Sequence, residues 1–268
     1  MPTPAQRARA LRILDGLCAR FPDARVARLD KDATTTHDDV AATIGRIQRG
    51  EVDVVIGTQM IAKGHDWPAV KLVGIVLADI ALSLPDFRAS ERAMSLLTQV
   101  AGRAGRGGSR GQVIVQTYDP THAALRYLLA HDVTAFAAAE LLVREQHRYP
   151  PYSRLARIRI EHEVETVATD IAHEVHSAIS DAGAAVTSWW KLSGPAPCPL
   201  ERLQGRTRIQ LLVFAADSTT RARLVAPLRG DVRPAPAGTQ RTHAQSLAHS
   251  LNASGARLVV DIDPINML

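Results

Sequence analysis

Two consecutive prolines, Pro150 and Pro151, divide the sequence into two parts with different patterns. Proline lacks a backbone N–H and disfavours a helical conformation in the residue before it, so a helix cannot pass through this pair. The Ala-rich stretch from Thr134 to His147 predicts a helix that ends just before the prolines. A chain of 268 residues is long enough for two modest domains. We therefore expect one domain over residues 1–148 and a second over residues 149–268.

Strand and helix patterns alternate in the first part. Strands are expected at residues 24–29, 52–56, 70–77 and 111–116, and helices at residues 7–20, 38–49 and 88–100. The β-branched run Val52-Asp53-Val54-Val55-Ile56, ended by Gly57, is typical of a buried parallel strand. The alternation favours an α/β fold, in which helices flank a parallel sheet and functional loops follow the carboxyl ends of the strands.

The second part has a different order of elements. Its patterns predict strand, helix, strand, strand, helix and strand, at residues 153–161, 165–182, 187–192, 207–214, 219–229 and 257–262. The segment Gly194-Pro-Ala-Pro-Cys-Pro199 is interpreted as a rigid proline loop. A β-α-β-β-α-β order predicts a ferredoxin-like α+β domain.

The glycine-rich stretch Gln99-Val-Ala-Gly-Arg-Ala-Gly-Arg106 carries two arginines, Arg103 and Arg106, in one turn. Fixed guanidinium groups of this kind stabilise the charge that develops on a transferred phosphoryl group. No carboxylate lies between Glu91 and Asp119 to neutralise them. The alternative is a solvated basic loop.

A second stretch, Gly57-Thr-Gln-Met-Ile-Ala-Lys-Gly-His-Asp66, follows a predicted strand. The Thr58 hydroxyl and backbone amides after a strand can hold a phosphate, and Gly64 permits close approach of a nucleic-acid backbone. Thr58 could instead cap a helix, and Asp66 could be an ordinary turn residue. Together, the two stretches are typical of the last two motifs of a superfamily-2 helicase motor.

Two parts of such a motor are absent from the 268 residues, namely a phosphate loop ending in Lys-Ser/Thr and an acidic box for Mg²⁺. The chain by itself is therefore expected not to turn over ATP. A net charge of +5 points mildly to a polyanionic partner. Cys18 and Cys198 are the only cysteines, so neither a disulfide framework nor a zinc site is predicted. No apolar run reaches membrane-spanning length, and we expect a cytoplasmic protein with no membrane partner.

Six motifs resemble, in order, those of the primosomal replication-restart helicase family (primosomal protein N′), and only two of the six are shared with other helicases. The resemblance runs from about Phe21 to the C-terminus. It implies an incomplete RecA-like second helicase lobe, without its first strand, followed by the family's C-terminal domain. The DNA-binding region, first motor lobe and zinc module of the family would all precede residue 1. The motifs are Gly57 to Asp66, Asp86-Phe-Arg-Ala-Ser-Glu-Arg92, Gln99 to Arg106, Tyr149-Pro-Pro-Tyr152, Gly194-Pro-Ala-Pro197 with Glu201-Arg202, and Asp261-Ile-Asp-Pro264.

The same resemblance implies a role for each site residue. Arg103 and Arg106 correspond to ATP-sensing arginines, while Gln99 and Gly102 lie close to the nucleotide. Asp66 corresponds to an acidic residue near the ribose. Thr58 matches a residue that touches the DNA backbone, in a loop that also contains Gln59, Lys63 and Gly64.

The whole family protein would couple ATP hydrolysis, with Mg²⁺, to 3′-to-5′ unwinding of DNA at stalled forks. Its partners would be forked DNA, single-strand binding protein and primosome proteins. Zinc would belong to the whole protein, because this chain supplies no ligands for it. Two alternatives remain: a non-catalytic DNA-binding or scaffold protein derived from a helicase, and a different superfamily-2 helicase.

Overall fold

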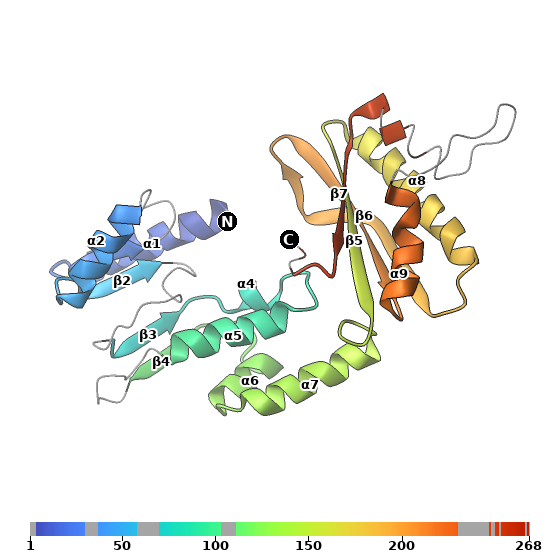
Figure 1. Cartoon of the computed structure of the whole chain (residues 1–268). Coiled ribbons are helices and arrows are strands. Elements are labelled where there is room, and N and C mark those ends of the chain that lie inside the picture. The colour runs from blue at the N-terminus through green and yellow to red at the C-terminus, as the bar shows by residue number, and fades with distance from the viewer. Residues whose placement is uncertain are drawn as a thin grey trace, which may run out of the picture. The chain divides into compact units, whose positions relative to one another are not determined.

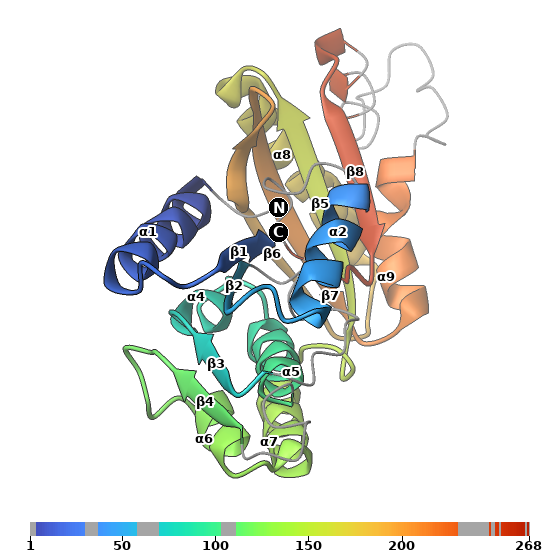
Figure 2. The ribbon, with the colours of Figure 1, turned by 90° about the vertical axis from the view of Figure 1, so that its left-hand side faces the viewer.

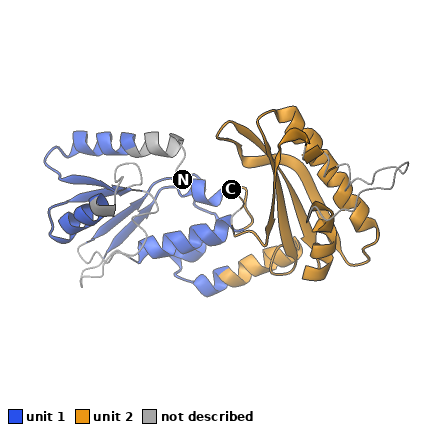
Figure 3. Cartoon of the chain, turned by 45° about the horizontal axis from the view of Figure 1, so that its top comes forward, with its two compact units in different colours: residues 1–84, 88–136 blue, residues 85–87, 137–268 orange. Residues whose placement is uncertain are grey.

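The computed structural model describes residues 4–29, 37–57, 70–102, 111–229, 247, 250–251, 253–265 and 267 (Figure 1). The chain forms two compact units, coloured separately in Figure 3. Unit 1 contains residues 1–84 and 88–136, and unit 2 contains residues 85–87 and 137–268. The segment Pro85–Phe87 therefore belongs to unit 2, although the residues on both sides of it belong to unit 1. The domain boundary expected after residue 148 stays a prediction.

Unit 1 is built from helices and parallel strands, as the alternating pattern predicts. β1 pairs with β2 and β3 pairs with β4, both in parallel, as two separate two-stranded sheets. No ladder joins the two sheets among the described strands. The strands are β1 (Val26–Leu29), β2 (Val54–Gly57), β3 (Leu72–Ile75) and β4 (Gln112–Val115), and the helices are α1 (Pro4–Arg20), α2 (His37–Gln48), α4 (Asp79–Leu82), α5 (Ala89–Ala101), α6 (Ala123–Leu129) and α7 (Val133–Gln146), whose last ten residues lie in unit 2.

A small apolar core holds β3, β4 and four helices, α4 to α7, together. Met94 and Leu97 of α5 pack with Leu125 and Leu128 of α6. Ile75 of β3 and Val115 of β4 are partly buried and pack against the same cluster. α5 lies beside these two strands in Figures 1 and 2. The sequence analysis missed α6, a seven-residue helix whose first turn is capped by the His122 ring, which accepts a hydrogen bond from the Ala124 N–H at 3.2 Å.

Unit 2 has the expected β-α-β-β-α-β order. Its strands form one antiparallel sheet in the order β6-β7-β5-β8, which is the strand order of a ferredoxin-like domain. The elements are β5 (Arg154–His162), α8 (Glu165–Ala184), β6 (Trp190–Leu203), β7 (Arg206–Ala215), α9 (Ser218–Val225) with a 3₁₀ turn over Ala226–Arg229, and β8 (Arg257–Ile262).

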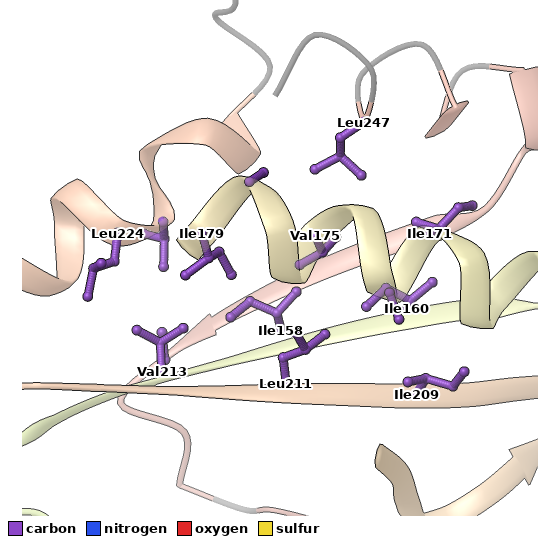
Figure 4. Packing of buried hydrophobic residues seen from close by; sticks show 14 of the residues in the cluster. Ile158, Ile160, Ile171, Val175, Ile179, Ile209, Leu211, Val213, Leu224 and Leu247 are labelled. Carbon is purple, nitrogen blue, oxygen red and sulfur yellow. The ribbon is translucent and has the colours of Figure 1, made fainter. Parts of the chain in front are cut away.

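The main core of unit 2 lies between the sheet and α8 (Figure 4). Alternate residues of the two central strands, such as Ile158 of β5 and Leu211 of β7, point toward the helix. Ile171, Val175 and Ile179 meet them from one face of α8. Fully burying an aliphatic side chain contributes about 1.5–3 kcal/mol. This cluster, larger than the one in unit 1, therefore makes the sheet and α8 the stable centre of unit 2.

The proline loop expected at residues 194–199 is wrong, because these residues belong to the 14-residue strand β6. β6 lies at the edge of the sheet and pairs only with β7. Prolines are tolerated in an edge strand, where an N–H can be absent without breaking a ladder. Register shifts after Ser193 and Pro197 accommodate them. The prolines suggested a loop, but they are compatible with an edge strand, which needs hydrogen bonds on one side only.

Trp189, which directly precedes β6, and Trp190, the first residue of β6, pack into different clusters. Trp190 packs against the main core of unit 2, and Trp189 against a smaller cluster that includes Leu155 and Phe214. The Arg148 guanidinium carbon lies 4.6 Å from the centre of the Trp189 ring. Both rings therefore pack within unit 2.

Gly183→Ala is expected to destabilise unit 2 strongly. A Cβ atom at this position in α8 would lie 2.1 Å from Cζ2 of the Trp190 ring, so the ring or the helix would have to move. Overpacking of this kind costs about 1–3 kcal/mol. Gly16→Ala is the matched control, because a Cβ atom at this helical glycine would meet nothing within 4 Å. Chemical denaturation should show a lower midpoint for Gly183→Ala only; equal midpoints for the two variants would contradict the packing described here.

Candidate functional site

Most of the site residues inferred from the sequence lie outside the described residues. The structure describes Gln99 and Gly102 of the set. The others, which fall between residues 58–69 or 103–110, are Thr58, Gln59, Lys63, Gly64, Asp66, Arg103 and Arg106.

The described residues fix where both stretches are attached. β2 ends at Gly57, which pairs with Leu29 at the end of β1, so the residue that follows, Thr58, leaves the carboxyl ends of two parallel strands. In open α/β sheets, ligands bind outside the carboxyl ends of the strands. The expected phosphate-contacting stretch therefore starts at the edge where such a fold binds its ligands.

The other stretch, Gln99 to Arg106, begins in the last turn of α5. Ala89, Ala93, Met94 and Leu97 are buried, and their spacing fixes which face of the helix is inside. Gln99 is exposed on α5. The N–H of Gly102 donates to the Thr98 carbonyl at 2.9 Å, so the helical hydrogen bonds continue up to the residue before Arg103.

The sequence analysis missed Asp79, a carboxylate that organises the loop after β4. Its Oδ1 accepts hydrogen bonds from the Thr117 hydroxyl at 2.9 Å and the Tyr118 N–H at 3.1 Å, and a longer one from the Asp119 N–H at 3.4 Å. Asp119 in turn accepts from the N–H and hydroxyl of Thr121, at 3.0 and 2.6 Å. Asp79 follows β3, and a carboxylate shortly after a parallel strand was the signal that could have revealed it.

Both carboxylates of this loop are more acidic than usual. Desolvation alone would raise the pKa of Asp79, but the hydrogen bonds from Thr117 and from backbone amides outweigh it and lower that pKa below its ordinary value. The hydrogen bond from the Thr121 side chain lowers the pKa of Asp119 in the same way. Both groups are therefore anionic at neutral pH, and their charge is used to order the backbone.

Asp79→Asn is expected to reduce the stability of the chain at neutral pH, and to reduce how steeply that stability falls in acid. A folded-state pKa below the unfolded value of about 3.9 means that the stabilisation is present above that pH and is lost as the pH falls through the folded-state pKa. Thermal unfolding at neutral pH and at steps below pH 4 measures both effects. Asp132→Asn is the control, because Asp132 is exposed and accepts one backbone hydrogen bond, from Ala135. Parallel acid profiles of wild type and Asp79→Asn would refute the assignment.

Arg208 lies in β7 and is only 4% exposed. Its Nε lies 3.4 Å from Oε1 of Glu161 on the neighbouring strand β5, and its Nη1 donates to the Leu200 carbonyl at 3.1 Å. The Arg208 guanidinium therefore makes its contacts inside unit 2.

The described part of the chain contains no group of three or more His, Cys, Asp or Glu side chains placed to hold a metal ion. Nor does any described helix combine the length and apolar character needed to cross a membrane.

Two protein families match the chain one after the other. The "Helicase conserved C-terminal domain" matches residues 5–108, and the "Primosomal protein N C-terminal domain" matches residues 145–265. The first match covers the parallel strands β1, β2 and β3 together with α5, and the second covers the antiparallel sheet of unit 2. Fold and matches together define the class: the chain holds the second lobe of a helicase motor, followed by a further α+β domain.

Curated relatives narrow this class to one family. Proteins named "Replication restart protein PriA" are 39% identical over 206 residues in Bacillus subtilis (75% of this chain, 25% of the relative), 36% over 256 residues in Treponema pallidum (96% and 36%) and 36% over 246 residues in Haemophilus influenzae (91% and 31%). The chain belongs to the PriA family and matches the C-terminal part of its members. It spans about a quarter to a third of the length of these relatives. A solved structure of a putative aminohydrolase from Staphylococcus aureus, with a TM-score of 0.25 and 9% identity, carries no argument about the fold.

Proposed function

We propose that the chain works as the C-terminal part of an ATP-dependent 3′–5′ DNA helicase that restarts stalled replication forks and assembles the primosome. One observation carries the proposal: a helicase C-terminal domain and the C-terminal domain of primosomal protein N occur in this order in one chain. Its relatives are named replication restart proteins. A non-catalytic scaffold would need neither the arginine pair nor the phosphate-contacting stretch, and no described feature favours it.

The proposed nucleotide contacts lie at the end of α5. Arg103 and Arg106 would contact the γ-phosphate and stabilise charge in the transition state, and they follow directly on the last helical hydrogen bond of α5. Gln99 and Gly102 would lie beside the nucleotide, and Asp66 beside its ribose. ATP with Mg²⁺ would be shared with a first lobe that supplies the phosphate loop.

The proposed DNA contacts begin at the carboxyl end of β2. Thr58 would hold a backbone phosphate, and Gln59, Lys63 and Gly64 would complete the loop. The proposed partners are forked DNA, single-strand binding protein and primosome proteins, in the cytoplasm. Zinc would be held elsewhere in a complete helicase.

A chimera tests this function directly. The 256-residue part of the Treponema pallidum relative that this chain matches over 96% of its length is replaced by residues 1–268. DNA-stimulated ATP hydrolysis by the chimera, with none by residues 1–268 alone, is the expected result. A folded chimera that binds ATP but hydrolyses none would refute the proposed role, and hydrolysis by the isolated chain would refute the need for a second lobe.

Weak and salt-sensitive DNA binding is expected for residues 1–268 alone. A net charge of +5 spread over two units can neutralise only a few phosphates. With about three phosphate contacts, affinity should fall roughly 10- to 100-fold between about 50 and about 200 mM salt. Fluorescence anisotropy with a labelled fork across this range measures the slope. Binding that does not change with salt would instead indicate a stacking or base-reading site.

A further inference from the structure

The segment Pro85–Phe87 is held in unit 2 by an aromatic stack. The Phe87 ring lies on the Tyr149 ring, with centroids 5.2 Å apart and planes at 15°. Tyr149 in turn packs against Phe214 of β7, with centroids 5.8 Å apart. Such pairs are favourable beyond the area that they bury. Phe87 is thus joined to the central sheet of unit 2 through a single intervening ring.

Two further contacts hold the same segment. The Arg144 guanidinium carbon lies 5.2 Å from the centre of the Phe87 ring, and its Nε donates to Glu140 at 3.1 Å, which fixes it in place. Asp86 is buried and accepts a hydrogen bond from the backbone N–H of Met267 at 3.3 Å. The Met267 side chain is itself buried in the small cluster with Leu155 and Phe214. Phe87 is therefore held by α7 and the Tyr149 turn, and Asp86 by the C-terminal end of the chain.

The chain leaves this segment directly into α5. Arg88 precedes the first helical residue, Ala89, and its carbonyl accepts from the Arg92 N–H at 2.9 Å to close the first turn. Helical hydrogen bonds then extend to Gly102. α5 lies in unit 1, so the held segment and the helix that follows it lie in different units.

We propose that Pro85–Phe87 is a strap by which the C-terminal domain holds the start of α5, and that Phe87, Tyr149 and Arg144 thereby position the helix that carries Gln99. The role in ATP turnover rests on the proposed function, whereas the mechanical link does not. A helix fixed at its first turn transmits a displacement along its axis, because its hydrogen bonds resist bending. The C-terminal domain would in this way set the nucleotide-facing end of the helicase lobe without touching nucleotide.

Hydrogen exchange of the full chain in the absence of nucleotide tests the strap. Tyr149→Ala removes the stacked ring in unit 2 and leaves unit 1 unchanged in sequence. It should raise the exchange rate of the Arg92 amide, in the first turn of α5, by about tenfold, as expected for the loss of a ring contact in a local opening. Tyr149→Phe keeps the ring and should retain wild-type exchange at Arg92.

Val175→Ala is the matched control. Val175 is fully buried in the main core of unit 2, whereas Phe87 and Tyr149 belong to the smaller cluster around Leu155 and Phe214. Truncation of Val175 therefore weakens unit 2 without removing a contact of the strap. It should raise exchange within unit 2 and leave Arg92 as in wild type. An Arg92 amide unaffected by Tyr149→Ala, or accelerated equally by Val175→Ala, would overturn the proposal. Because no ATP is present, absence of helicase activity would leave this result intact.

Discussion

Arg106→Ala is expected to lower the DNA-stimulated ATP turnover of the chimera by about a hundredfold or more, the scale of other arginines that stabilise phosphoryl transfer. The guanidinium acts mainly on charge that develops in the transition state, so nucleotide binding should fall much less than turnover. Arg106→Lys keeps the charge but not the planar fork of donors, and should restore only part of the rate. Steady-state kinetics and a nucleotide-binding titration separate the two quantities.

Arg126→Ala provides the matched control for charge. Arg126 is exposed on α6 in the same unit, so its removal lowers the net charge equally but should leave turnover unchanged. If Arg106→Ala behaved like Arg126→Ala, Arg106 would be a solvated surface arginine and the phosphate-contacting role would have to be abandoned.

Glu161→Ala is expected to destabilise unit 2 by about 3–5 kcal/mol, the cost of breaking a buried ion pair from one side. The Glu161 side chain is 11% exposed and its Oε1 lies 2.7 Å from Nε of Arg159 and 3.4 Å from Nε of Arg208. Its removal leaves the Arg208 guanidinium, 5% exposed, without its carboxylate. Denaturant unfolding of the variant measures the loss.

Two further variants distinguish the buried pair from surface charge. Arg257→Ala removes a guanidinium that is 67% exposed and 3.9 Å from Glu161, so it should cost no more than about 1 kcal/mol. Replacing both Glu161 and Arg208 by Leu should recover much of the stability, since neither charge is then left buried alone. A small loss for Glu161→Ala would show that water reaches Arg208.

The elements that periodicity could predict are those with a strong pattern and a single buried face. The β-α-β-β-α-β order of unit 2 is confirmed: β5 and β7 are central strands that are buried along most of their length, and α8 carries its buried apolar residues at helical spacing. The short helix α6 was missed, and β6 was predicted to end at residue 192, before its prolines, whereas it continues to Leu203. α6 is stabilised by a histidine cap and by packing on α5, and β6 tolerates prolines because only one of its edges is paired.

The candidate site could be predicted only where local chemistry signals it. Arg103 and Arg106 stand out by their spacing, whereas Asp79 gains its importance from a loop that is distant in sequence. No local pattern marks Arg208 as a buried charge, because its partner Glu161 comes close only once β5 and β7 pair. Long-range pairing is the information that neither periodicity nor spacing contains.

The discontinuity of unit 2 affects how such a domain can be exchanged between proteins. A recombination event that moved residues 137–268 as one block would leave Asp86 and Phe87 behind, and Tyr149 and Met267 would lose the segment that covers them. The recipient would have to offer an aspartate and an aromatic residue at the matching point of its own helicase lobe. Inheritance of the C-terminal domain is thereby tied to inheritance of the lobe, and the two are expected to travel together through gene rearrangements.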